Sequence, residues 1–136
     1  MNYLQPYINF NGECKKAMTF YRSCLGGELQ MQKISESPMA MQTPSAMAGQ
    51  ILHAELKTAH LQLFGSDINN EPYFIGNNIY LSLQCESMNE LERSFALLKK
   101  EGREIVGLHQ TMWGSHYGEL QDQFGIRWML HFSKKG

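Results

Sequence analysis

The amino-acid sequence predicts an α+β fold in which one module, a strand followed by a helix and three more strands, occurs twice. Apolar residues recur at steps of three and four over 13–25 and again over 88–100, as a helix with one buried face requires. Segments with strand character precede and follow both helices. Phe20 maps onto Phe95 by an offset of 75 residues, which also relates the glycines after the two helices. We predict a single domain over residues 1–136. Its first module covers about 1–67 and its second about 77–136.

In the first module, changes in the spacing of apolar residues mark where one predicted element ends and the next begins. The helix at 13–25 is expected to end at Gly26–Gly27, because glycine readily adopts the left-handed backbone of a helix C-terminus. Thr58–Ala59 is expected to join two strands, with His60 and Gln62 on one face of the second strand. The predicted strands are 4–10, 28–34, 51–57 and 60–65.

A long connector, residues 35–49, follows the second predicted strand and contains Pro38 and Pro44. Loops of this length are usually mobile or functional. Two interpretations remain open: a surface loop whose methionines pack against the fold, and a lid over a pocket.

The second module follows a linker at 67–76 that is rich in Asn, Pro and Gly. Ser87 is predicted as the N-cap of the second helix, with Glu90 completing a capping box. Trp128 is expected in the core, because strand alternation places it on the opposite face from Met129. The predicted strands are 78–84, 103–108, 116–121 and 126–132.

Composition and charge narrow the class of protein. The 136 residues carry 12 Lys and Arg against 13 Asp and Glu, a formal net charge of −1. The chain has no excess of positive charge with which to bind the phosphate backbone of a nucleic acid, so nucleic acid is not an expected partner. The sequence contains no apolar run near the roughly 20 residues of a membrane span and no recognisable signal peptide, which predicts a cytoplasmic protein without a membrane partner. Three scattered cysteines are expected to be reduced thiols.

Each predicted sheet has one face that its own module cannot cover. A single helix covers only one face of a four-stranded sheet, so the other face must meet the second module, a partner chain or a ligand. Small-molecule sites commonly occupy such concave places.

The sequence contains the segments PYINFNGECKKAMTFY, LGGEL, ILHAELK and TMWGSHYGELQDQFGIRWML. These segments resemble the PhnB-like branch of the glyoxalase / bleomycin-resistance / extradiol-dioxygenase superfamily, also called vicinal oxygen chelate proteins. The resemblance implies two βαβββ modules that form a U-shaped, partly open mixed β-sheet cavity, and a homodimer. Similar proteins often carry the label 3-demethylubiquinone-9 3-methyltransferase, yet the sequence has no glycine-rich turn of a Rossmann-type methyl-donor site.

Metal-using members of the superfamily place one ligand on each of four cavity strands. By resemblance, these positions fall on Gln62, Asn78, Met129 and either Pro6 or Tyr7. Two amides, a thioether and a proline or phenol form a poor donor set for a hard divalent ion. We therefore predict no metal or other cofactor.

Other residues are candidates for the cavity wall. His131 and Arg127 share a strand face with Met129, and His60 shares one with Gln62. A displaced metal site that uses His60, Gln62 and His131 is the alternative to histidines without a metal role. The predicted ligand-cavity set is Gln62, Asn78, Tyr80, Trp113, Met129, His60, Arg127 and His131.

Arg127 favours an acidic or oxygen-rich ligand. Glu119 and Asp122 are expected as surface turn residues, with a catalytic base as the alternative. No catalytic residue is assigned.

The sequence thus predicts a homodimeric, metal-independent protein that binds a small molecule in the manner of bleomycin-resistance proteins. The alternative is a metal-dependent lyase, isomerase or thiol transferase acting on a substrate with neighbouring oxygens.

Overall fold

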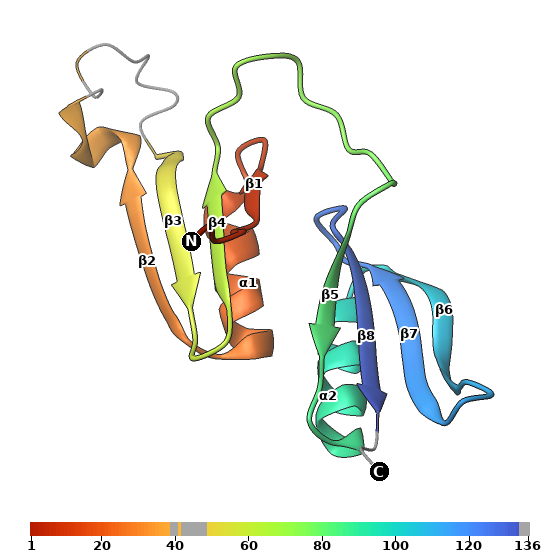
Figure 1. Ribbon diagram of the computed structural model, residues 1–136. Coiled ribbons are helices and arrows are strands. Elements are labelled where there is room, and N and C mark those ends of the chain that lie inside the picture. Colours follow the sequence, from red (N-terminus) through yellow and green to blue (C-terminus); the bar gives the residue numbers. More distant parts are fainter. Residues whose placement is uncertain (39–40, 42–48, 134–136) are drawn as a thin grey trace. The chain divides into compact units, whose positions relative to one another are not determined.

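The computed structural model describes residues 1–38, 41 and 49–133. The chain divides into two compact units, Met1–Tyr73 and Phe74–Gly136, here called unit 1 and unit 2 (Figure 1). In the part of the chain that is described, each unit combines one four-stranded sheet with one long α-helix, which confirms the α+β prediction. The modules predicted at 1–67 and 77–136 lie inside these units.

Unit 1 begins with a strand that is shorter than predicted, and most of the connector predicted at 35–49 lies outside the described residues. The helix and the third strand agree with the prediction within one residue. The elements are β1 (Tyr7–Asn9), α1 (Cys14–Leu25), β2 (Glu28–Lys33), the 3₁₀ helix η1 (Ile34–Glu36), β3 (Ile51–Lys57) and β4 (Gln62–Ser66).

Unit 2 repeats the same order of elements, after an irregular segment that contains the predicted linker. Its helix and its last two strands lie within one residue of the predicted bounds. The elements are β5 (Tyr80–Gln84), α2 (Met88–Lys99), β6 (Arg103–Gln110), β7 (Ser115–Gln121) and β8 (Arg127–Ser133).

The two sheets have the same topology. Strand order is β1-β4-β3-β2 in unit 1 and β5-β8-β7-β6 in unit 2. In each sheet the first pair of that order is parallel and the other pairs are antiparallel. These are mixed sheets, and their shared order confirms the predicted duplication.

One backbone contact recurs in both units and shows which residues correspond. A Cβ added to Gly27 would lie 2.6 Å from the Lys57 carbonyl oxygen, and one added to Gly102 would lie 2.2 Å from the Gln121 carbonyl oxygen. Real Cβ atoms do not approach so closely, so both positions need glycine. Lys57 and Gln121, the last residues of β3 and β7, therefore occupy equivalent places.

The helices begin in different ways. Ser87 caps α2 as predicted, because its hydroxyl accepts a 3.1 Å hydrogen bond from the Glu90 N–H. The Glu90 carboxylate accepts from the Glu86 N–H, one residue earlier than a capping box would place it. In α1 the N-cap residue Glu13 makes no side-chain capping bond. Asp67 serves there instead, accepting from the backbone of Gly12 and Cys14.

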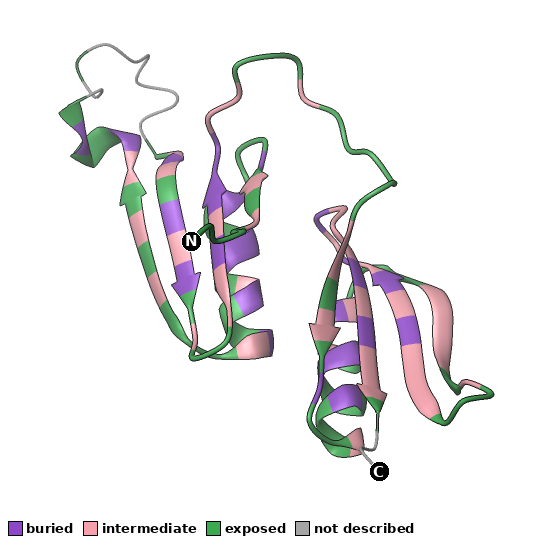
Figure 2. Cartoon of the chain, in the orientation of Figure 1, coloured by how far each residue is buried: buried purple, intermediate pink, exposed green. Residues whose placement is uncertain are grey.

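Each helix packs against its own sheet and buries one face of it (Figures 1 and 2). Trp128 is 2% exposed, which confirms its predicted core position. Its indole N–H donates to the Asp122 carboxylate, which also accepts from the backbone of Phe124 and Ile126. The prediction that Asp122 is a surface residue was therefore wrong, because its carboxylate holds the turn between β7 and β8 together from inside.

Within the described residues, no α-helix of either unit packs against the opposite face of its sheet. Along β8 buried residues alternate with half-buried ones, so Arg127, Met129 and His131 lie on this open face, as the strand pattern predicts (Figure 2). Within the described residues, no helix combines the length and apolar character that crossing a membrane requires.

Candidate functional site

The open face of unit 2 carries most of the predicted ligand-cavity residues, arranged in rows by the register of its strands. The arginine row lies where β8 begins and consists of Tyr80, Arg127, Gln121 and Arg103. The middle row consists of Ser82, Met129 and Glu119. The histidine row consists of Gln84, His131, Tyr117 and His109.

Hydrogen bonds and ring stacking hold the arginine row together. The Arg127 guanidinium lies 5.8 Å from the centre of the Tyr80 ring, and its Nη1 donates to the Tyr80 hydroxyl over 3.3 Å. Its Nη2 donates to Gln121 Oε1 over 3.4 Å. The same oxygen accepts from Arg103 Nε over 3.2 Å. One neutral amide oxygen therefore joins two guanidinium groups.

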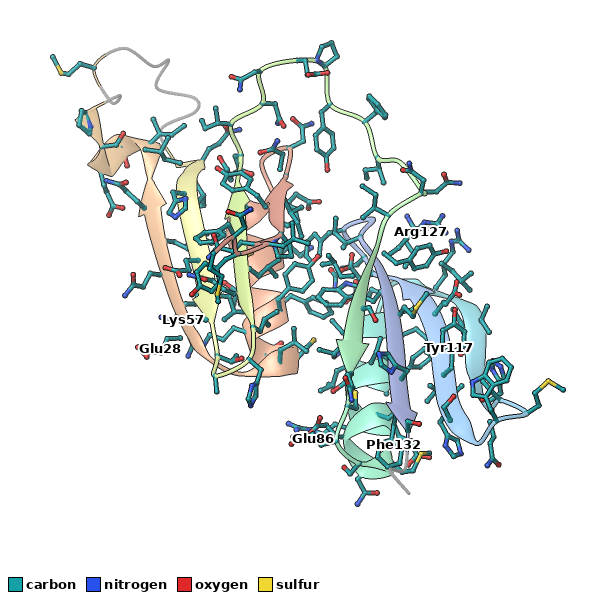
Figure 3. The ribbon with its side chains drawn as sticks, viewed as in Figure 1. Glu28, Lys57, Glu86, Tyr117, Arg127 and Phe132 are labelled. Carbon is teal, nitrogen blue, oxygen red and sulfur yellow. The ribbon has the colours of Figure 1, made fainter. Side chains whose placement is uncertain are left out.

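The other two rows are less charged. The Tyr117 hydroxyl donates to the Glu119 carboxylate, and the Tyr117 ring meets the His109 ring edge-on at 5.8 Å. Met129 lies beside Glu119 in register. Glu119 therefore lies in the middle of a strand, and the predicted turn position is wrong. Figure 3 shows Arg127 near the start of β8 and Tyr117 further along the same sheet.

Unit 1 contains an open groove of about 580 Å³, lined by residues 3–6 and 57–62. Gln62 and His60 both contribute to it. The Gln62 amide is already engaged, because Gln5 donates to its oxygen and its nitrogen donates to Glu55. His60 is exposed in the turn between β3 and β4, so its predicted position in the strand was wrong.

Beyond the groove, an aromatic cluster lies on the open face of unit 1. The rings of Tyr7, His53 and Phe64 have centroids 5.4 to 6.4 Å apart. This cluster was not predicted from the sequence, although strand alternation places His53 with Glu55 on one face.

Besides His60, two more predicted cavity residues lie outside the strands. Asn78 is exposed and precedes β5, so the strand predicted from residue 78 begins two residues too early. Trp113 is 77% exposed in the turn between β6 and β7. That turn is held by Thr111, whose N–H donates to the Ser115 carbonyl over 2.7 Å.

The donors at the superfamily's metal positions do not fit a hard divalent ion. Gln62 is bound on both sides by other side chains, Asn78 lies outside its strand, and Met129 offers only a thioether. Within either unit, no group of three His, Cys, Asp or Glu side chains among the described residues is placed to hold a metal. We therefore derive no chemistry through a metal at these positions.

The cysteine thiols are poor nucleophiles. Burial raises the pKa of Cys14 to about 12, and the nearby Asp67 charge adds to the effect. Burial, with a smaller effect of Glu90, raises the pKa of Cys85 to about 11. Both thiols are therefore protonated at neutral pH, and the protonated form does not attack or bind metals well. The two side chains are buried, which agrees with a packing role.

Sequence reasoning missed several members of the open face of unit 2, namely Arg103, Gln121, Tyr117 and His109. The signal that could have found them is the pairing of β7 with both β6 and β8. Gln121 alternates with buried Leu120, so its face follows from the same rule that placed Arg127. Two bulges in the β6–β7 pairing obscure the register of Arg103 and His109.

The duplicated βαβββ fold with two open faces is that of the glyoxalase/bleomycin-resistance proteins. A protein of that class from Burkholderia phytofirmans PsJN shares the fold at 10% identity, with a TM-score of 0.61 and 97% of each chain covered. Within the superfamily the chain belongs to the PhnB-like family whose model, described as 3-demethylubiquinone-9 3-methyltransferase, matches residues 2–131.

Two relatives of about 30% identity and one solved structure with the same fold are similar to this chain. Protein YjdN of Escherichia coli (strain K12) is 30% identical over 144 residues, covering 97% of this chain and 96% of YjdN. The crystal structure of PA1353 from Pseudomonas aeruginosa is 31% identical, with a TM-score of 0.88 over 99% of this chain and 100% of that one. A Bacillus cereus PhnB protein is 22% identical, with a TM-score of 0.75 over 97% and 100%.

The family description names a methyl transfer, which we do not assign to this chain. The turns that lead from a strand into a helix span residues 10–13 and 85–87. Neither has the glycine-rich pattern with which Rossmann-type sites hold a nucleotide cofactor.

Proposed function

We propose that the protein binds a small molecule without a metal, and that the open face of unit 2 forms part of the binding surface. The observation that carries this proposal is the arginine row. Four polar or aromatic side chains meet at one end of a sheet face that the helix of its own unit leaves uncovered. Binding sites typically combine such uncovered surface with a few convergent polar groups.

A ligand screen tests this function. Thermal unfolding is followed with metabolite and antibiotic libraries, once with a chelator present and once with Mn²⁺, Ni²⁺ or Zn²⁺. A bound ligand raises the midpoint by mass action. We expect at least one compound to raise the midpoint equally with the chelator. A shift that requires a metal would contradict the proposal and support the metal-dependent lyase, isomerase or transferase instead.

We also propose that the protein is a homodimer in the cytoplasm. Exposed apolar side chains support an interface, since Leu4 is 99%, Ile79 is 74% and Trp113 is 77% exposed. The buried thiols of Cys14 and Cys85 support a reducing compartment. Sedimentation equilibrium should give a dimer mass, and a monomer at all micromolar concentrations would contradict the first part. Fractionation of cells that express the native chain tests the second part.

A further inference from the structure

We infer that the arginine row is an oxyanion site, in which Arg127 and Arg103 together bind a carboxylate or phosphate group of the ligand. The inference rests on the proposed function, because it assigns a chemical class to the molecule that binds this face. Its basis is that Arg127 and Arg103 both donate hydrogen bonds to one neutral acceptor, the Gln121 side-chain oxygen.

The two guanidinium groups are not neutralised by the protein. A guanidinium group is a cation that donates hydrogen bonds and accepts none. Among the described residues, no carboxylate oxygen lies within 4.0 Å of either group. The two positive charges that contact the same Gln121 oxygen repel each other. An anion bound next to both would attract each of them and make the total electrostatic energy favourable.

The acidic residues around the arginine row have other partners. Glu104 pairs with Lys99 at 3.0 Å. Glu119 accepts from the Tyr117 hydroxyl, in the direction away from the arginine row. Asp122 accepts from Trp128 and from two backbone N–H groups. The chain thus directs these carboxylates elsewhere and leaves the arginines for an external anion.

One donor of Arg127 is buried and lacks an acceptor. Its Nε is shielded from solvent and has no hydrogen-bond partner in the described structure, whereas both terminal nitrogens have neutral ones. Buried donors are nearly always satisfied, so this unpaired N–H carries a free-energy cost that a hydrogen bond to a ligand oxygen would remove. An oxyanion suits the position, because a guanidinium binds carboxylate or phosphate through two parallel N–H donors.

Gln121 is oriented for this role. Its amide nitrogen donates to the Gly125 carbonyl over 3.4 Å, so its oxygen faces the two arginines. Tyr80 also holds the guanidinium, through a cation–π contact and a hydrogen bond to its hydroxyl. The side chains are therefore arranged before any ligand arrives, which lowers the ordering cost of binding.

Titration with inorganic phosphate tests the inference directly. Backbone amide resonances are followed at pH 7 while sodium phosphate replaces sodium chloride at constant ionic strength. We expect saturable shifts at the amides of Tyr80, Arg103, Gln121 and Arg127. Linear, unsaturated shifts spread over the surface would overturn the inference, because general screening produces that pattern.

Charge-removing variants locate the site. Arg127→Gln and Arg103→Gln should each weaken phosphate binding about tenfold or more, the typical effect of a lost charge-assisted hydrogen bond. Lys57→Gln removes a cation from the equivalent position of Gln121 in unit 1 and should leave the affinity unchanged. Equal weakening by all three variants would overturn the inference in favour of non-specific attraction.

A third variant tests whether a side-chain carboxylate of the protein can take the place of the bound anion. Gln121→Glu positions a carboxylate between the two arginines while preserving the size of the side chain. We expect its thermal midpoint to exceed that of the wild type without phosphate, and its phosphate response to be lost. An unchanged phosphate affinity in this variant would contradict the site.

Two further measurements separate the ligand classes and the two proposals. If acetate saturates the same amides at lower concentration than phosphate, the site selects carboxylates, and the reverse order assigns it to phosphates. A library ligand whose affinity is the same for the wild type and Arg127→Gln would overturn the oxyanion site and leave the binding function standing. If phosphate binds at Arg127 but no library compound binds, the oxyanion site stands and the broader function fails.

Discussion

The two units share one backbone plan, but their open faces differ most at one end of the sheet. In unit 1 the residues at this end are Gln62, saturated by neighbouring side chains, and Lys57, which lies opposite Glu28 (Figure 3). In unit 2 the equivalent positions hold Arg127 and Gln121, and the neighbouring strand supplies Arg103 instead of an acid. At this end of the sheet unit 1 places a cation opposite an acid in register, whereas unit 2 places two cations beside one neutral amide.

This difference indicates which constraints act on a duplicated module. The covered face must stay apolar, and Gly27 and Gly102 must stay small because a carbonyl oxygen lies against each. The open face has neither constraint, so its residues can change independently in the two copies. In this chain the two neighbouring arginines, Arg127 and Arg103, therefore belong to the open face of unit 2.

The largest expected effect comes from the buried aspartates. Asp67 accepts from three backbone N–H groups, those of Gly12, Cys14 and Ile51. Asp67→Ala leaves these donors without an acceptor and should lower the free energy of unfolding by about 3 kcal/mol or more. Urea denaturation measures the loss, with Glu92→Ala at an exposed helix position as the control.

An aspartate-to-alanine substitution in unit 2 tests whether the two units unfold independently of each other. Asp122→Ala should cost a similar amount, but amide hydrogen exchange should accelerate first in unit 2, whereas Asp67→Ala should accelerate it first in unit 1. Uniform acceleration in both variants would show that the two units unfold together.

The glycine contacts predict the next largest effect. Alanine at Gly27 or Gly102 places a methyl group against a backbone carbonyl and should cost roughly 1–3 kcal/mol in unfolding free energy. Gly49 has open space around it, so Gly49→Ala should leave stability nearly unchanged. A cost at only one of the two positions would disprove their equivalence.

Alkaline pH should weaken both units through their buried thiols. The fold raises the pKa of Cys14 to about 12 and that of Cys85 to about 11, so the folded thiols stay protonated while unfolded thiols ionise above pH 9.0. Their stabilisation is complete below pH 9 and is lost as the pH rises, by about 1.4 kcal/mol per pH unit for each thiol. Cys14→Ala should flatten this decline up to about pH 12, and Cys85→Ala up to about pH 11. Equal slopes in the wild type and both variants would contradict this account.

The helix starts give the smallest effect. Ser87→Ala removes the local cap of α2 and should cost about 1 kcal/mol, whereas Glu13→Ala should change little because Glu13 makes no capping bond. Denaturation curves of the two variants provide the test, and an equal loss would show that the local cap does not distinguish the helices.

Which face a strand residue occupies could be predicted from the sequence, but where the strands begin could not. Alternation along β8 placed Arg127, Met129 and His131 correctly, because a buried Trp128 fixes the phase. Asn78 was misplaced because β5 extends only as far as its partner β8, whose first paired residue is Arg127. A strand ends where its partner ends, and the partner is distant in the sequence.

The chemistry of the candidate site was only partly predictable for a similar reason. Arg127 was recognised as favouring an acidic ligand, but Arg103 and Gln121 become its neighbours only through pairing between strands. His60 was placed in a strand because the turn was expected at two residues. The observed turn is wider, closed by a 2.9 Å bond from the Thr58 N–H to the Leu61 carbonyl.

The distant cap of α1 has a consequence for how the chain folds as it is synthesised. Ser87 leaves the ribosome directly before the helix that it caps, so α2 can begin as soon as its own residues emerge. The start of α1 at Cys14 must wait for Asp67, and β1 must wait for β4 in the same segment. We expect the N-terminal helix of the nascent chain to stay loosely formed until this later stretch has emerged.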